Sequence, residues 1–313
     1  MRMKRGLVIK ITSLSFLALI IYSFVPVIVL YFQQVPPALS NEAAVKKLAG
    51  KTGDRFEFIV MGDNHSGLIF NDSAALKLAR RINREDRFRK LPVDFVMIAG
   101  DLTLRGSGWD YAIFIKLCSR IKYPVISSLG NHDDDGANAE LFKNIAGEAE
   151  FSFVNRNSYF IVIDNSAGEI TNEQFAWLEE ELKKSMPYQH RFVIAHKPPF
   201  SPYQQSWYRP ELGSWPLSLM KLCERYNVDM IFSGHEHMFK EQTFGKARYI
   251  TTGGGGMLTH FPRQDGGFLH YVVVRVYGDY CDYEVRKIFP PLWEFLAYYM
   301  WKDIFYFLVD AIY

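Results

Sequence analysis

Five short segments of the sequence place histidine, aspartate or asparagine directly after a run of Val, Ile and Phe residues. The segments are Gly62-Asp63-Asn64-His65, Gly100-Asp101, Gly130-Asn131-His132-Asp133, Ala195-His196 and Ser233-Gly234-His235-Glu236-His237. Imidazole is the commonest protein ligand for a transition metal, and carboxylate and amide oxygens complete such sites. Seven side chains are therefore candidate metal ligands: Asp63, His65, Asp101, Asn131, His196, His235 and His237.

The segments that carry these side chains alternate in a way that would bring the ligands together. Strands are expected over 56–61, 94–99, 124–128, 192–195 and 229–232, with helices over 73–90, 109–121, 172–185 and 217–226. Further strands are expected over 151–154, 159–163, 237–243, 248–252, 268–276 and 280–287. Strands that alternate with helices of this length predict an α/β fold with a largely parallel sheet. Ligands bind at the carboxyl ends of such strands, so the five segments can meet there.

The number and chemistry of the candidate ligands indicate a centre of two metal ions. Seven groups exceed one tetrahedral site, but they suit two ions that share one carboxylate, as in centres for phosphoryl displacement. The mixture of nitrogen and oxygen ligands favours manganese, iron or zinc over magnesium or calcium.

In order and spacing, the five segments resemble the calcineurin-like metallophosphoesterase superfamily. The resemblance implies a four-layer αββα sandwich and hydrolysis of phosphate mono- or diesters. It implies one metal held by Asp63, His65, Asp101 and His237, and a second held by Asp101, Asn131, His196 and His235, with Asp101 as the bridge. Leu104 stands where purple acid phosphatases have a tyrosine, so the sequence is similar to the general phosphoesterase branch.

The expected mechanism follows from charge. Two divalent ions neutralise the phosphate oxygens and lower the pKa of a bridging water, whose hydroxide attacks phosphorus. The leaving oxygen then needs a proton. His132, next to a ligand but not itself one, is expected to be the general acid, and Asp133 is expected to orient its imidazole.

Composition limits the alternatives. The chain has 313 residues, 49% of them hydrophobic, and a formal net charge of +2. It lacks the concentrated basic excess of a nucleic-acid binder, so no nucleic-acid partner is expected and a nuclease is disfavoured. Two alternatives remain open: a non-catalytic protein that uses the same fold for docking, and a phosphodiesterase specific for cyclic nucleotides or lipid phosphates.

The N-terminal region is typical of a membrane anchor. Residues 1–10 form a basic flank, and residues 11–32 are predominantly apolar over about the length that crosses a hydrocarbon core. A cleaved signal peptide is the alternative, with Ala38-Leu39-Ser40 as a weak cleavage site. The basic flank predicts a single-pass protein whose catalytic domain, residues 54–288, lies on the extracytoplasmic side after a linker over 33–53.

Residues 289–313 form a second apolar segment, this time with helical periodicity. Apolar side chains recur at i, i+3, i+4 and i+7 from Trp293 to Ala311, while Glu294, Lys302, Asp303 and Asp310 fall on the other half. Four charges make a spanning helix costly, so an amphipathic helix lying on the membrane is expected. The alternative is a helix packed against the catalytic sheet or a partner subunit.

Overall fold

The computed structural model describes residues 18, 24–37, 39–133, 139–200, 214–257 and 261–289, apart from the side chain of Phe88. The chain divides into two compact units, one of Met1–Gln33 with Phe289–Tyr313 and one of Gln34–Ile288. Residues 24–31 are helical. Among the described residues, no helix is both long enough and apolar enough to cross a membrane. Most of the expected anchor and nearly all of the segment 289–313 lie outside the described residues.

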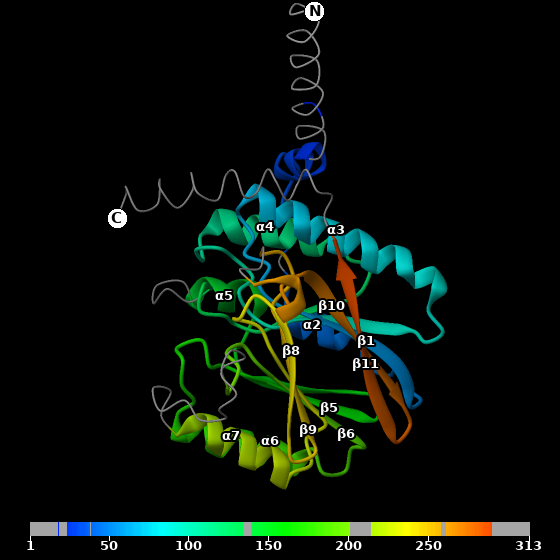
Figure 1. Cartoon of the computed structure of the whole chain (residues 1–313), viewed down its shortest axis with the longest axis vertical. Helices are drawn as coiled ribbons and strands as arrows, with labels where there is room; N and C mark the ends of the chain where they lie inside the picture. Colours follow the sequence, from blue (N-terminus) through cyan, green and yellow to red (C-terminus); the bar gives the residue numbers. More distant parts are fainter. Residues whose placement is uncertain are drawn as a thin grey trace, which may run out of the picture. The chain divides into compact units, whose positions relative to one another are not determined.

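The unit Gln34–Ile288 contains two sheets (Figure 1). The first has the order β11 (Tyr280–Ile288), β10 (Leu269–Tyr277), β1 (Arg55–Met61), β2 (Val93–Ile98) and β3 (Val125–Ser127). The second has the order β4 (Phe151–Asn155), β5 (Ser158–Ile163), β6 (His190–Ala195), β7 (Met230–Ser233), β9 (Ala247–Thr252) and β8 (Phe239–Phe244). The centres of both sheets are parallel, from β1 to β3 and from β5 through β7 to β9, and antiparallel strands complete the edges.

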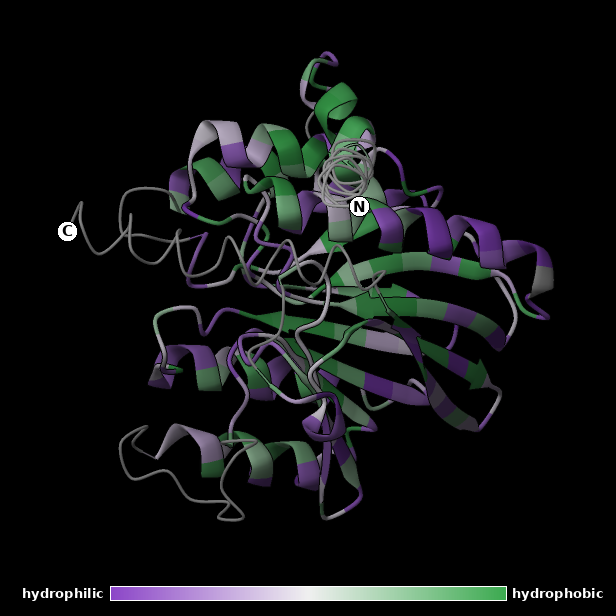
Figure 2. Cartoon of the chain, turned by 45° about the horizontal axis from the view of Figure 1, so that its top comes forward, coloured by the Kyte–Doolittle hydropathy of each residue, from purple (hydrophilic) through white to green (hydrophobic). Residues whose placement is uncertain are grey.

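The two sheets pack face to face because alternate strand residues point to opposite faces. Phe58 of β1 lies in the core between the sheets, where its ring centroid is 5.3 Å from that of Phe95, 5.1 Å from Phe160 and 5.0 Å from Phe192. Figure 2 shows these strands coloured largely hydrophobic. Strands of both sheets supply this core, so it fixes the position of one sheet against the other.

Helices cover the outer face of each sheet, as the resemblance implied. Helices α3 (Ile69–Glu85), α4 (Gly108–Cys118) and α5 (Ala139–Ala146) pack with β1 and β2 in one cluster. Helices α6 (Asn172–Lys184) and α7 (Trp215–Arg225) pack with β5, β6 and β7 in another. Thr171 and Gln174 form the capping box that starts α6.

Part of the predicted linker is helical and packs against the core. The predicted linker 33–53 contains a short helix, α2 (Asn41–Lys46), that begins at the N-cap Ser40. The Asn41 side chain donates to the Ser127 carbonyl at 2.9 Å and accepts from the Ser127 amide at 2.8 Å. Ala44 and Leu48 join the core between the sheets. A six-residue helix has little stability of its own, so these contacts across the fold hold it in place.

Candidate metal centre

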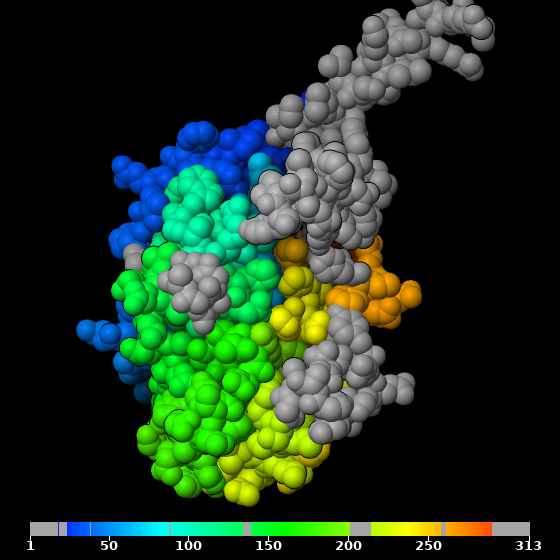
Figure 3. Space-filling model, turned by 90° about the vertical axis from the view of Figure 1, so that its left-hand side faces the viewer, coloured from blue at the N-terminus to red at the C-terminus, as the bar shows by residue number. Residues whose placement is uncertain are grey.

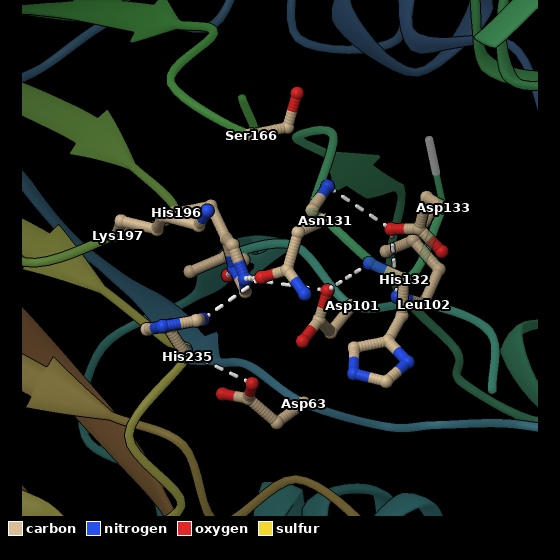
Figure 4. Close-up of polar contacts among 12 residues, drawn as sticks. Asp63, Asp101, Leu102, Asn131, His132, Asp133, Ser166, His196, Lys197 and His235 are labelled. Atoms are coloured by element: carbon tan, nitrogen blue, oxygen red, sulfur yellow. Dashed lines mark hydrogen bonds and ion pairs between the residues drawn. The ribbon is translucent and has the colours of Figure 1, made fainter. Parts of the chain in front are cut away.

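The ends of β1, β2, β3, β6 and β7 bring all seven candidate ligands into one region. Figure 4 shows Asp63, Asp101, Asn131, His196 and His235 among them. Two groups of side chains have ligand atoms within 4.8 Å of one another, one made of Asp63, His65, Asp101 and His237 and the other of Asp101, His196 and His235. Asp101 belongs to both groups. On the surface seen in Figure 3, green segments of the chain border the yellow segment.

In the first group, the ring nitrogens and carboxylate oxygens lie close enough together to bind one ion. Nε2 of His65 lies 3.1 Å from Nε2 of His237 and 3.4 Å from Oδ2 of Asp101. Nε2 of His237 lies 3.6 Å from Oδ1 of Asp63. Ligand atoms of the three side chains that follow β1 and β7 thus lie within 4.8 Å of one another and of a carboxylate oxygen of Asp101.

The second group meets the other oxygen of Asp101 through His196, and Asn131 lies beside its two imidazoles. Nε2 of His196 lies 3.2 Å from Oδ1 of Asp101. The amide oxygen of Asn131 lies 3.1 Å from Nε2 of His196 and 2.8 Å from Nδ1 of His235. Each carboxylate oxygen of Asp101 therefore faces its own set of ligands.

The backbone at four of these residues is left-handed. The φ angles are 61° at Asp63, 45° at His65, 50° at Asp101 and 67° at His235. Residues other than glycine rarely adopt positive φ, and when they do so together they mark a functional site where the surrounding structure holds the strain. Hydrogen bonds from the Asp63 amide to the Gly100 carbonyl and from the His65 amide to the Asp101 carbonyl connect the two loops.

Glycines beside the ligands allow the loops to approach so closely, a role that the sequence analysis did not assign to them. A Cβ at Gly130 would lie 2.0 Å from the Asp101 amide nitrogen, and one at Gly234 would lie 2.5 Å from Oδ2 of Asp63. Both distances are far below van der Waals contact. The available signal in the sequence was that each glycine directly precedes a ligand.

Burial and mutual charge set the protonation of the centre. Burial alone would raise the pKa of Asp101, but His196 and His65 outweigh it and hold the pKa well below its usual value. Burial would likewise lower the pKa of His196, and Asp101 instead raises it to about 9. Burial raises the pKa of Asp63 and lowers that of His235 to about 3. In these surroundings Asp101 is the stable anion and His235 has a neutral ring, whereas a metal would have to displace a proton from His196.

The side chains fit a pair of transition-metal ions. Oδ2 of Asp63 is buried without a hydrogen-bond partner. Buried polar atoms are otherwise nearly always paired. The facing Nε2 atoms of His65 and His237 also place two imidazole nitrogens at one point. A donor set of imidazoles, carboxylates and one amide suits manganese, iron or zinc.

Comparison with known proteins decides the family. The sequence model of the calcineurin-like phosphoesterases matches residues 56–239. The chain belongs to the calcineurin-like phosphoesterase family. Two curated relatives are named probable cyclic nucleotide phosphodiesterases. The one from Vesicomyosocius okutanii is 25% identical over 50% of this chain and 67% of its own length. The one from Xenorhabdus bovienii is 27% identical over 46% of this chain and 61% of its own length.

A third curated relative and two solved structures are also similar to this chain. A glycerophosphodiester phosphodiesterase of Enterobacter lignolyticus is 24% identical over 50% of this chain and 61% of its own length. The chain thus spans about three fifths to two thirds of the curated relatives it matches. Two solved structures share the fold at a TM-score of 0.59: a Plasmodium protein described as the anchor in the inner membrane complex, and a yellow lupin purple acid phosphatase. The Plasmodium protein is 16% identical, and the match covers 75% of this chain and 85% of that protein. The lupin enzyme is 15% identical, and the match covers 76% of this chain and 52% of that enzyme.

His132 lies beside the ligands of this phosphoesterase. Its ring centroid is 4.5 Å from that of His65, and its Nδ1 is 2.8 Å from the Leu104 carbonyl oxygen. The residue is exposed. It is therefore accessible to a substrate while one ring nitrogen is held by the backbone.

The expectation that Asp133 orients the His132 imidazole is wrong. Oδ2 of Asp133 accepts from the amides of Leu102 and Gly130 at 3.0 and 3.1 Å. Oδ1 accepts from the Thr103 amide at 2.9 Å and from its hydroxyl at 2.8 Å. Adjacent residues point apart in an irregular loop, and in Figure 4 the His132 ring lies away from Asp133. Asp133 instead fixes the loop that carries Asp101, and burial, with Asp101 second, raises its pKa to about 7.

Lys197 is a polar residue of the site that the sequence analysis did not single out. It follows the ligand His196, and its backbone amide donates to Oδ1 of Asn165 at 3.0 Å. Burial lowers the pKa of its ammonium group. A half-buried cation next to a ligand is a candidate contact for a phosphate oxygen, and its place directly after His196 was the available signal.

Proposed function

We propose that this chain hydrolyses phosphate mono- or diesters at a centre of two divalent transition-metal ions. The observation that carries the proposal is Asp101, whose two carboxylate oxygens face separate ligand groups. Asp63, His65 and His237 would be the other ligands of one ion. The other ligands of the second ion would be Asn131, His196 and His235. When bound, manganese, iron or zinc would neutralise phosphate oxygens and make hydroxide available near neutral pH.

His132 would supply the proton that the leaving oxygen needs. Its Nδ1 lies at hydrogen-bond distance from the Leu104 carbonyl, which can only accept, so Nδ1 carries a hydrogen. The proton to be transferred is therefore held at Nε2. Lys197 would bind and orient the phosphate from the side of His196.

The substrate class is supported by the relatives. Both probable cyclic nucleotide phosphodiesterases and the glycerophosphodiester phosphodiesterase are named for diesters. We therefore propose that diesters are preferred. The competing possibility is a docking protein that retains the fold without turnover.

The test is turnover by the purified chain, loaded separately with manganese, iron or zinc. Cyclic nucleotides, nucleotides, phospholipids and polyprenyl phosphates would be the substrates. We expect metal-dependent hydrolysis, with diesters cleaved faster than monoesters. Tight metal binding with no hydrolysis of any compound would contradict the proposal and favour the docking protein.

We also propose that the enzyme is attached to a membrane through residues 11–32, with its catalytic domain on the extracytoplasmic side. The proposal is supported by the apolar composition of the segment and by its basic flank. Protease added to intact spheroplasts should digest the catalytic domain. Protection of that domain until the membrane is permeabilised would contradict the orientation.

A further inference from the structure

A cavity of about 500 Å³ lies on the outer face of the first sheet, beside the C-terminal end of α3. Six cationic side chains line it: Arg81, Arg84, Arg89, Lys90, Arg275 and Arg286. Glu57 and Glu85 are its only carboxylates. In Figure 2 the C-terminal half of α3 is coloured hydrophilic. We call this cavity the basic cavity.

The basic cavity is separate from the metal centre. Glu57 lies near the start of β1, opposite Arg275 of β10, whereas the ligand Asp63 follows the other end of β1. The outward-facing residues of β1 closer to the ligands, Ile59 and Met61, pack in the apolar cluster under α3 and α4. A ligand in the basic cavity would therefore not occupy the site of hydrolysis.

The two carboxylates are shared among several arginines and do not balance them. Glu57 contacts Arg89 at 2.5 Å and Arg275 at 3.4 Å. Glu85 pairs with Arg81 and lies 3.7 Å from both Arg89 and Arg286. Two outer carboxylates, Asp282 and Glu284, also contact Arg275, and Glu284 lies 3.0 Å from Arg286 as well. Across the described chain, neither Arg84 nor Lys90 takes part in an ion pair, so positive charge is left in excess.

Hydrogen-bond donors are also left over. The Arg89 side chain is only 6% exposed, and its Nε and Nη2 atoms are buried without a hydrogen-bond partner. Nε of Arg286 also lacks a hydrogen-bond partner, although that side chain is 37% exposed. Nη2 of Arg89 and Nε of Arg286 each lie 3.7 Å from Oε2 of Glu85, an ion-pair contact that is too long for a hydrogen bond. Such donors are costly to bury unless a ligand or water completes them. A guanidinium fork is matched in geometry by the oxygens of a phosphate group.

An ordinary structural explanation covers only part of this arrangement. Basic residues at a helix C-terminus interact favourably with the helix dipole, which accounts for Arg84 in the last turn of α3. It does not account for Arg275 and Arg286, which come from β10 and β11. The cavity volume falls within the range of small-molecule sites and exceeds what a single inorganic phosphate needs.

We propose that the basic cavity binds a small phosphorylated molecule that carries at least two phosphate charges. Arg89, held in place by Glu57, lines the cavity with a guanidinium whose hydrogen bonds are incomplete, and the exposed Arg84 and Lys90 contribute charge. The phosphate belongs either to a free anion or to the headgroup of an anionic lipid. The site is independent of the proposed hydrolysis.

The test is calorimetric titration of the full-length chain in detergent with inorganic tripolyphosphate, and separately with soluble short-chain phosphatidic acid. Arg84→Gln with Lys90→Gln removes two cavity charges that hold no ion pair. Lys221→Gln with Lys246→Gln removes two exposed charges elsewhere as the matched control. A further variant, Arg89→Lys, keeps the charge opposite Glu57 but removes the fork. All these proteins keep the same metal centre, so phosphate bound there contributes equally.

We expect the cavity variant to weaken binding of at least one probe by about tenfold, as removal of two partly exposed charges should. Arg89→Lys should weaken the same probe, and the control should bind as the unmodified chain does. Loss with tripolyphosphate indicates a free anion, and loss with phosphatidic acid alone indicates a lipid headgroup. Equal affinities in all four proteins would overturn the proposal, while turnover without added ligand would still report on hydrolysis.

Discussion

At the scale of single residues, the metal centre depends on one carboxylate between two groups of imidazoles. Asp101 keeps its charge although it is buried, because His196 and His65 lie on either side of it. Asp133, two residues past Asn131, holds the backbone of Leu102 and Thr103 and so fixes where Asp101 lies. Neighbouring residues that are not ligands themselves, such as Asp133, thus set the positions of the ligands.

His132→Ala should lower turnover about a hundredfold for substrates with poor leaving groups, because the leaving oxygen then departs without a proton. Metal content should be unchanged, since the side chain is not a ligand. The loss should shrink for a nitrophenyl ester, whose leaving group is stable as an anion. Parallel rate measurements on both kinds of ester check this, and equal losses for the two would count against the acid role.

At the scale of elements, the residues predicted from the sequence and those missed differ in a physical way. Polar residues after buried strands could be predicted as ligands, because parallel strands end at the same edge of a sheet. The hydrogen-bond partners of Asp133 could not be predicted, because they lie in the loop that follows a different strand, β2. Helix α2 was missed because Asn41 and Ser127, far apart in sequence, stabilise it. The basic cavity likewise needs α3 beside β10 and β11.

An ion pair with a predictable pH dependence lies at the starts of β6 and β7, the ends of these strands away from the metal ligands. Burial alone would lower the pKa of His190, but its contact with Asp229, together with Cys281, raises it to about 10. Folding therefore favours the protonated ring. Its contribution to stability is complete below about pH 6.5, the ordinary histidine pKa, and is lost as the pH rises toward about 10.

Urea unfolding of the full chain across this window should show the free energy of unfolding fall by something on the order of 2 kcal/mol, since water screens the partly exposed Asp229. Asp229→Asn should remove most of this fall, because it keeps the shape of the side chain and removes its charge. A fall of the same size in that variant would assign the pH dependence to other groups.

At the scale of the whole molecule, membrane attachment at two ends of the sequence remains a prediction. Residues 11–32 are apolar, and residues 289–313 have one apolar helical face. If residues 11–32 span a bilayer and residues 289–313 lie on it, the enzyme would meet substrates close to the membrane. A lipid-attached phosphate ester would then be favoured over a soluble one.

Liposome binding separates the two segments. With residues 11–32 deleted, the chain should still bind liposomes through its C-terminal segment, and a further deletion of 291–313 should abolish binding. Co-sedimentation of both proteins with the same vesicles gives the comparison. If the first protein stays in solution, the C-terminal helix packs against protein instead of lipid.

The most direct test of the account is metal content measured together with turnover in Asp101→Asn. The unmodified chain should hold two transition-metal ions and hydrolyse a phosphodiester. Because one carboxylate serves both ligand groups, its loss should weaken both ions together and lower turnover by about a thousandfold or more, a larger effect than that of any other single ligand. Two ions per chain with near-normal turnover in Asp101→Asn would contradict the central claim.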